Sequence, residues 1–353
     1  MTYKLNKSTL TFFGLFLVGF LIAALGIYFL PERFFFDADT IIKDKSNEIG
    51  LIGSYPFTIW FYHVTGLKNL HFSIIGILQY SFSVFLLYKI GIPKAFKIVN
   101  VKNSLVYLSL FMLAMFLCMP TKEFINFTYM FLIVLVLKRK KNYLLSIFSI
   151  ILLLLLFGFF FREYYLLVAV IAIFLYLISK IKINNRKIAV FSYGLLVVIA
   201  LSLSYGAIKG KHMSESSREG INMLRKGGKA TNSIIISPVN TKTWYGETIG
   251  IYYGFFSVNI PVNGFKHILK PQIILFVFWQ LFLFIILLIR YEKVLKKGTK
   301  NNFEIWGFYI VFSYFICQGV FEPDLGSAIR HKMGIFPLIY FTLYYDSFRK
   351  KIQ

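Results

Sequence analysis

Apolar runs of about 15 to 20 residues recur along this chain, and short polar breaks separate them. A helix needs about 20 apolar residues to cross the roughly 30 Å hydrocarbon core of a bilayer. Hydrophobic residues make up 58% of the 353 residues and the mean hydropathy is +0.68, more apolar surface than a soluble chain of this length could bury. The pattern predicts an all-α, polytopic integral membrane protein. We expect a single transmembrane domain over 1–353 with about ten spans, at approximately 10–30, 71–90, 104–119, 123–137, 143–161, 164–179, 188–206, 271–289, 303–320 and 333–347.

The basic residues predict the orientation of these spans. More than half of the 39 lysines and arginines lie near the N-terminus and in every second break, whereas the short breaks between them contain only Lys122, Arg162, Arg330 and Lys332. Because cytoplasmic loops carry an excess of Lys and Arg, this alternation predicts that both termini are cytoplasmic. The basic breaks are 89–102, 138–141, 180–187, 290–300 and 349–351.

The acidic residues follow the opposite distribution. All of the 15 except Glu292, Glu304 and Asp346 fall on the predicted outer side. Acidic residues contribute little to topology, so a function has to explain this asymmetry. We therefore expect the chemistry of the protein to take place at the outer face.

The formal net charge of +24 does not indicate a nucleic-acid-binding protein. The basic residues form short clusters beside predicted spans and no stripe along a soluble face, so we interpret them as topology signals and contacts with anionic lipids. Cys118 and Cys317 each lie inside an apolar run. This placement supports neither a disulfide framework nor a thiolate metal site.

Two predicted outer segments, 31–70 and 207–270, are long enough to be structured. The aromatic run from Phe57 to Tyr62 predicts a short helix in the membrane interface, or else a re-entrant segment. The second segment is basic at first and aromatic from Trp244 onward. It suits either a lid over an anionic lipid headgroup or a solvated loop followed by a helix that lies on the membrane.

Asp37 and Asp39 directly follow the first predicted span, next to three phenylalanines. Two carboxylates at this spacing can bind a divalent cation or act as a base toward a hydroxyl acceptor. The alternative is the start of a solvated loop with no chemical role. Their position just beyond the first span favours the functional interpretation.

Residues 119–123 form the whole connection between the third and fourth spans. Pro120 ends one helix, Thr121 can cap the next, and Glu123 in the first turn suits the positive end of the helix dipole. The same dipole disfavours Lys122. We therefore expect Lys122 to pair with an anion, either a neighbouring carboxylate or a bound phosphate.

Arg162, Glu163 and Tyr164 form the polar break in an otherwise apolar run over 143–179. With no glycine or proline to make a loop there, the two helices must turn within a few residues and hold Arg162 at or just below the outer surface. A charge at the centre of a spanning helix costs about 2.5 to 3.5 kcal/mol on insertion scales, so charges near the bilayer are candidates for function. A snorkelling arginine in a tight turn is the alternative.

The connection over 321–337 carries both signs of charge, with Glu322 and Asp324 followed by Arg330 and His331. An arginine can clamp phosphate oxygens through its planar fork, and a histidine titrates near neutrality and can shuttle a proton. A structural role for the histidine is the alternative. A glycine and a proline shortly afterwards predict that the last span is broken.

At these four places the sequence resembles the membrane-embedded polymerases of bacterial surface polysaccharides, the Wzy class of O-antigen and capsule or exopolysaccharide polymerases. It resembles more loosely the GT-C superfamily of polyprenyl-linked glycosyltransferases. The resemblance covers most of the chain and departs from the paired Arg-rich outer loops described for some polymerases, because only 207–270 is basic. It rests on the span number, the outer loops, Pro-x-Lys-Glu at 120–123, Arg-x-Tyr at 162–164, Gly-Ser-x-x-Arg-His at 326–331 and the acidic Asp37-Ala38-Asp39.

The resemblance implies transfer of an undecaprenyl-diphosphate-linked glycan onto the end sugar of another lipid-linked repeat unit. The reaction would take place at the outer face of the bacterial cytoplasmic (inner) membrane. It needs no nucleotide, consistent with the lack of a Gly-rich phosphate loop. We expect no cofactor beyond a conceivable divalent cation at Asp37 and Asp39. Expected partners are the lipid-linked oligosaccharides, membrane lipids, and chain-length regulator and flippase proteins, with no nucleic acid.

The expected roles fall into three groups. Cations bind the leaving diphosphate, acids and an imidazole supply the catalytic base and proton shuttle, and neighbouring residues support them. Three alternatives stay open: a GT-C enzyme that adds one sugar from a polyprenyl phosphate, a transporter or flippase for the same lipid-linked glycan, and a non-catalytic assembly partner whose outer charges are interface contacts. The cations are Lys122, Arg162 and Arg330. The acids and the imidazole are Asp37, Asp39, Glu322, Asp324 and His331, and the supporting residues are Glu123, Glu163 and Tyr164.

Overall fold

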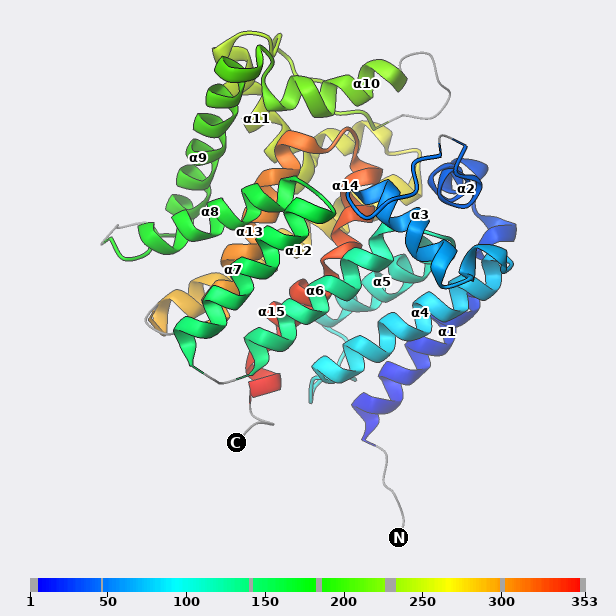
Figure 1. The fold of residues 1–353 in the computed structure, drawn as a ribbon. Coiled ribbons are helices and arrows are strands. Elements are labelled where there is room, and N and C mark those ends of the chain that lie inside the picture. The colour runs from blue at the N-terminus through cyan, green and yellow to red at the C-terminus, as the bar shows by residue number, and fades with distance from the viewer. Residues whose placement is uncertain are drawn as a thin grey trace. The chain divides into compact units, whose positions relative to one another are not determined.

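The computed structural model is helical throughout the residues that it describes, apart from one isolated β-bridge between Ile234 and Asp324 (Figure 1). This confirms the predicted all-α fold for that part of the chain. The described residues are 6–45, 47–139, 142–181, 186–225, 233–298 and 302–349.

Within these residues, six helices are long and apolar enough to cross a membrane. The prediction of a helical, multi-pass membrane protein is therefore confirmed. The six are α1 (Lys7–Phe29), α4 (Phe72–Ile90), α7 (Tyr143–Phe160), most of α9 (Arg186–Lys209), α12 (Pro271–Lys296) and α13 (Phe303–Phe321).

The other four predicted spans also coincide with helices, but these are shorter. The total of about ten spans and their orientation stay predictions. The four helices are α5 (Val101–Phe116), α6 (Lys122–Lys138), α8 (Tyr164–Ile178) and α15 (Phe336–Arg349).

The contacts divide the chain into two compact units. The first consists of residues 1–163 together with 330–353, and the second of residues 164–329. That the two units form a single transmembrane domain over 1–353 stays a prediction.

In the first unit, α1 packs against α4 and α5, and α6 packs against α4, α7 and α15. Figure 1 shows α1 and α4 running side by side. A Cβ atom on Gly76 of α4 would lie 2.6 Å from the carbonyl oxygen of Ala23 and 2.8 Å from the Cα of Cys118. Glycine at this position therefore allows α4 to approach two backbones closely.

The first outer segment contains two short helices, α2 (Phe36–Lys43) and α3 (Ser54–Val64). Helix α3 confirms that the aromatic run is helical. Both helices are anchored by a small apolar core, in which Ile41 of α2 packs with Ile59 and Tyr62 of α3 and with Ile75 of α4. A second apolar cluster, in which Ala38 of α2 packs with Cys118 and Met119, holds α2 beside the polar connection over 119–123.

The start of α3 is tied to the end of α7. Gly53 has a positive φ of 101°, which a glycine adopts readily, and its N–H donates to the carbonyl of Phe160 at 2.8 Å. The predicted interruption of the last span is also confirmed. Helix α14 (Leu325–Gly334) ends at Gly334, and α15 starts two residues later.

In the second unit, α13 forms the centre, and nearly all of its residues are buried. It packs against α8, α9, α12 and α11 (Trp244–Asn259). The aromatic part of the second outer segment is therefore a helix packed on α13 and α9. Both alternatives for this segment, a lid or a helix lying on the membrane, stay predictions.

A buried arginine links α11 to α13 in this unit. Arg218 lies on a π-helical turn over Glu215–Glu219, and its Nη1 donates to the carbonyls of Gly250 at 3.2 Å and Gly319 at 2.8 Å. The nearby Glu247 is also buried and accepts hydrogen bonds from the hydroxyls of Ser202 and Ser214. Nη1 of Arg218 thus bonds to backbone carbonyls and Glu247 mainly to serine hydroxyls, while Nε and Nη2 of Arg218 are buried without a hydrogen-bond partner among the described residues.

Candidate functional site

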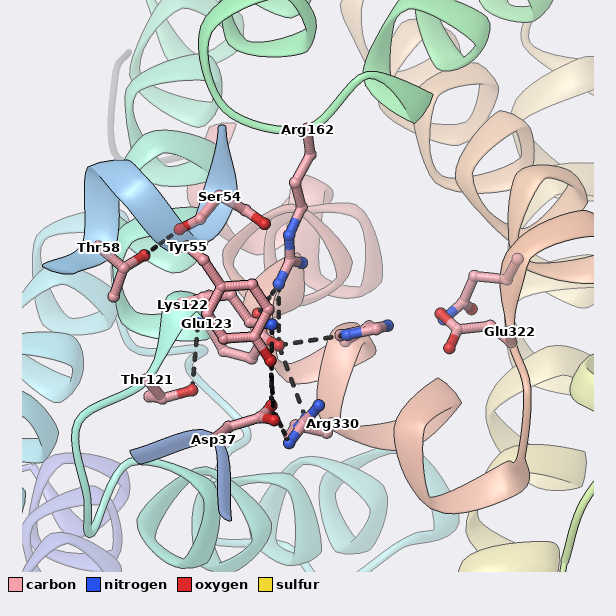
Figure 2. Close-up of polar contacts among 12 residues, drawn as sticks. Asp37, Ser54, Tyr55, Thr58, Thr121, Lys122, Glu123, Arg162, Glu322 and Arg330 are labelled. Carbon is pink, nitrogen blue, oxygen red and sulfur yellow. Dashed lines mark hydrogen bonds and ion pairs between the residues drawn. The ribbon is translucent and has the colours of Figure 1, made fainter. Parts of the chain in front are cut away.

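A cluster of ionisable side chains lies within the first unit (Figure 2). Its members come from four parts of the chain that are far apart in sequence. Figure 2 shows Arg162, Lys122 and Arg330 directed toward Glu123 and Asp37. The cluster consists of Asp37 on α2, Lys122 and Glu123 at the start of α6, Arg162 just after α7, and Arg330 and His331 on α14.

Glu123 is the closed centre of the cluster, with a side chain only 1% exposed. Arg162 Nη2 donates to both of its carboxylate oxygens, at 2.8 and 3.1 Å. His331 Nε2 lies 3.3 Å and Arg330 Nε 3.7 Å from Oε1 of the same group. A carboxylate buried this deeply is stable only when it is paired, so Glu123 and Arg162 hold each other in place.

The local sequence explains why Glu123 can occupy this position. The Thr121 hydroxyl accepts from the N–H of Glu123 at 3.3 Å, which confirms the predicted cap, and the carboxylate lies in the first turn of α6. Tyr62 fixes the connection before it, because its hydroxyl accepts from the Thr121 N–H at 3.0 Å. Gln79 of α4 donates to the carbonyl of Met119 at 3.3 Å.

Asp37 forms the more open edge of the cluster. Its carboxylate lies 2.8 Å from Arg330 Nη1 and 3.8 Å from Lys122 Nζ, and it accepts from the Tyr55 hydroxyl at 2.9 Å. The Asp37 side chain is 28% exposed and that of Arg330 24%, against 6% for Arg162. A ligand can therefore reach Asp37 and Arg330 more readily than the central pair.

The surroundings shift the pKa values at this edge. Burial opposes ionisation of Asp37, but Arg330, Lys122 and the Tyr55 hydrogen bond outweigh it and hold the Asp37 pKa well below its usual range. Burial, followed by the charge and hydrogen bond of Asp37, raises the pKa of Tyr55 above its ordinary value. Burial lowers the pKa of Lys122 to about 8, although Asp37 opposes that shift. At neutral pH the edge therefore holds an ionised Asp37 between two cations.

Lys122 pairs with the carboxylate of Asp37. A neighbouring carboxylate was one of the two anions predicted for it. Its ammonium also lies 3.5 Å from the centroid of the Tyr55 ring, a favourable cation–π position. Tyr55 thus contacts both Asp37 and Lys122. No local sequence pattern indicates this role for Tyr55, because the contact depends on how α3 packs against α6.

The helical conformation of residues 36–43 separates the two aspartates of the Asp-x-Asp motif. Residues two apart on an α-helix point in directions about 200° apart. Asp39 accordingly pairs with Lys43 at 2.6 Å and is about half exposed, whereas Asp37 joins the cluster. The described residues contain no group of three or more His, Cys, Asp or Glu side chains that could hold a metal ion. A divalent cation at Asp37 and Asp39 stays a prediction that this geometry does not favour.

Two further predicted site residues directly follow Arg162 in the sequence. Glu163 is exposed next to Arg162. Tyr164 belongs to the second unit, where its ring contacts Tyr165, Tyr314 and Phe321.

Glu322 and Asp324 also belong to the second unit. Glu322 accepts from Gln318 at 2.9 Å. Asp324 caps the start of α14, since its carboxylate accepts from the N–H and the hydroxyl of Ser327, both at 2.8 Å. These contacts give both acids a local structural role.

The structure brings Asp37, Lys122, Arg162 and Arg330 together in one cluster, while their chemical roles stay predictions. At neutral pH the three cations Lys122, Arg162 and Arg330 surround two carboxylates, which leaves an excess of positive charge among these five groups. Such an edge can bind an oxyanion by exchanging it for Asp37.

No protein-family model matches this chain, and no curated protein or solved structure is significantly similar to it.

Proposed function

We propose that this protein is a glycosyltransferase of the polysaccharide-polymerase kind. It transfers a glycan from an undecaprenyl diphosphate carrier to the end sugar of another lipid-linked repeat unit. The observation that carries the proposal is the exchangeable edge formed by Asp37, Arg330 and Lys122, next to the closed pair of Glu123 and Arg162. Resemblance to the Wzy class and the multi-pass helical fold support it.

The first step is an exchange of anions at this edge. In the free protein Asp37 occupies the positions on Arg330 and Lys122 that phosphate oxygens would take. A diphosphate offers more oxygens and more charge than one carboxylate, and an arginine fork binds phosphate bidentately. The donor diphosphate therefore displaces Asp37 from its cations. Arg162 remains on Glu123 and keeps the edge in place.

The exchange also prepares the base. Once the cations no longer contact Asp37, its pKa rises toward that of an ordinary carboxylate, which makes it a better proton acceptor. The acceptor hydroxyl oxygen then bonds to the anomeric carbon, the bond from that carbon to the diphosphate oxygen breaks, and the hydroxyl proton passes to Asp37. Arg330 and Lys122 offset the charge that develops on the leaving diphosphate.

The proposal includes a location. We propose about ten spans in a bacterial inner membrane, with both termini in the cytoplasm and the cluster at the outer face. The alternation of basic breaks supports this orientation, and the resemblance to the Wzy class supports the choice of membrane. Chain-length regulator and flippase proteins are the proposed partners. Reporter fusions after residues 45, 163 and 298 test this topology, since the first two should report an outer and the third a cytoplasmic position.

A deletion strain complemented with single variants tests the activity, with the polymer ladder of surface glycan as the readout. We expect Asp37→Asn and Arg330→Ala to leave one repeat unit and no ladder. Asp39→Asn is the matched control for Asp37, because it lies on the same helix, paired with Lys43 and away from the cluster. Arg33→Ala is the matched control for Arg330.

Three outcomes contradict the proposal. A full ladder with Arg330→Ala removes the assignment of the diphosphate site. Loss of the first repeat unit in the deletion strain indicates addition of a single sugar at an earlier step. Accumulation of complete lipid-linked repeat units on the cytoplasmic side indicates a carrier.

A further inference from the structure

An apolar groove lies within the second unit, far along the chain from the charged cluster. It has a volume of about 470 Å³ and lies among α9, α11 and α12. Aromatic and aliphatic side chains form most of its wall, and Phe191 contacts the rings of both Phe255 and Phe284. The groove is lined chiefly by Phe191, Leu195, Phe255, Ile260, Phe284 and Leu288.

The groove opens toward the hydrocarbon of the bilayer. Two of its three helices, α9 and α12, are long and apolar enough to span a membrane. Three lining residues at its rim are strongly exposed: Ile188 at 62%, Phe256 at 50% and Ile289 at 49%. Exposed apolar side chains on spanning helices face lipid, so the surrounding phase is made of lipid chains and not water.

The volume matches one lipid chain. The volume of about 470 Å³ lies within the range of roughly 300 to 1,000 Å³ found for sites that hold one small ligand. A single fatty acyl chain is a ligand of this size class.

One end of the groove is cationic. The groove reaches Glu292, whose carboxylate pairs with Lys296 at 3.4 Å, and Lys293 and Lys297 on the same last turns of α12 are exposed. Arg186 begins α9 two residues before the groove residue Ile188. Basic residues between helices at a membrane surface attract anionic lipid headgroups.

We propose that this groove binds one acyl chain of an anionic phospholipid from the surrounding bilayer, with the phosphate headgroup at the cationic end of α12. An apolar, laterally open wall and a basic end together fit an amphiphile with a single negative charge. The inference is independent of the proposed catalytic function, because it uses no residue of the charged cluster.

The test is native mass spectrometry of the full chain, purified in detergent and titrated with phosphatidylglycerol or phosphatidylcholine carrying identical acyl chains. We expect phosphatidylglycerol to remain bound at lower concentration than phosphatidylcholine. Leu288→Trp fills the groove and should abolish retention of the bound lipid. Ile285→Trp is the matched control, since it lies one turn earlier on α12, is 47% exposed and does not line the groove.

A second pair of variants tests the headgroup contact without altering the groove. Each exposed lysine near the membrane surface contributes about fivefold to binding of an anionic lipid. Lys293→Gln with Lys296→Gln should therefore reduce the preference for phosphatidylglycerol, whereas Lys209→Gln at the opposite end of α9 should not. The double lysine variant and its Lys209→Gln control test the proposal even if Leu288→Trp does not fold.

Three results would overturn the proposal. They are equal retention of the two lipids by the unmodified protein, unchanged phosphatidylglycerol binding in both Leu288→Trp and the double lysine variant, or displacement of phosphatidylglycerol by an equal concentration of undecaprenyl phosphate. The last result would assign the groove to an isoprenoid chain instead.

Discussion

The two compact units each bury an arginine among helices, but they pair it with different kinds of acceptor. In the first unit Arg162 and Arg330 contact carboxylates of Glu123 and Asp37. In the second unit the Nη1 group of Arg218 donates to backbone carbonyls, and Glu247 accepts mainly from serine hydroxyls.

The difference separates a site that can exchange its ligands from one that cannot. A backbone carbonyl cannot move away without unfolding its helix, so Arg218 acts as a fixed link between α11 and α13. A side-chain carboxylate can rotate away, and Asp37 is in addition partly exposed. Burial of charge alone therefore does not identify a chemical site. A chemical site is identified by a partner group that can move and by access from outside.

The largest expected effect is on the closed pair of the first unit. Arg162→Ala leaves Glu123 buried without its main partner, which should lower the free energy of unfolding by about 3 to 5 kcal/mol. Thermal unfolding in detergent measures the change. Adding Glu123→Gln removes the unpaired charge and should restore part of the loss. An equally unstable double variant would mean that the charge pair is not the cause.

Arg330→Ala should separate activity from stability. We expect a decrease of about 10² to 10³ in transfer rate, since removal of one charge-stabilising donor has this effect in other enzymes. The melting temperature should change little, because Arg330 is partly exposed and Glu123 keeps its Arg162 partner. A variant that loses stability in proportion to activity would indicate that Arg330, like Arg218, is a fixed structural link.

Gly254→Ala tests the fixed link in the second unit. A Cβ atom at this position would lie 2.0 Å from the carbonyl oxygen of Gly319 and 2.1 Å from Nη1 of Arg218. The helices must move apart, which should lower the free energy of unfolding by about 1 to 3 kcal/mol. Gly14→Ala on α1 is the control, because its Cβ would meet nothing within 4 Å. Similar unfolding curves for the two variants would rule out tight packing at Gly254.

Tyr55→Phe should have a smaller effect on the exchangeable edge. The variant keeps the ring beside Lys122 but removes the hydrogen bond to Asp37, a loss of about 1.5 kcal/mol for a bond to a charged group. The free-energy cost of displacing Asp37 should therefore be lower. We expect tighter binding of a diphosphate lipid and reduced turnover. Tyr55→Leu removes the ring as well. If the two variants behave identically in binding and turnover, the ring contact with Lys122 has no separate role, and a Tyr55→Phe variant that matches the unmodified protein would show that the hydroxyl contact has none.

The smallest expected effect is a pH dependence from Lys122. Its pKa of about 8 means that it is cationic at neutral pH and loses its charge as the pH rises through 8. Binding of a diphosphate lipid should therefore weaken above that pH, and Lys122→Arg should remove the dependence because arginine stays charged. An unchanged profile in the arginine variant would show that another group titrates.

Much of the first unit was predictable from local sequence rules. The cap at Thr121, the carboxylate of Glu123 in the first turn of α6 and the break at Gly334 follow from short-range chemistry and were confirmed. The contact of Tyr55 with both Asp37 and Lys122 was not predictable, because it joins residues on three separate helices. Asp39 was placed beside Asp37 in sequence, yet the helical turn of α2 directs it elsewhere.

The sequence by itself determined that this is a helical membrane protein and which charges its short connections carry, since hydrophobic length and local helix signals act over a few residues. Only the tertiary structure decided that Glu123 is closed off by Arg162 while Asp37 remains exchangeable, and that Glu322 and Asp324 have local partners instead. The physical reason is that the partner and the solvent access of a charge depend on which distant helices pack around it, and periodicity along one chain contains no record of that packing.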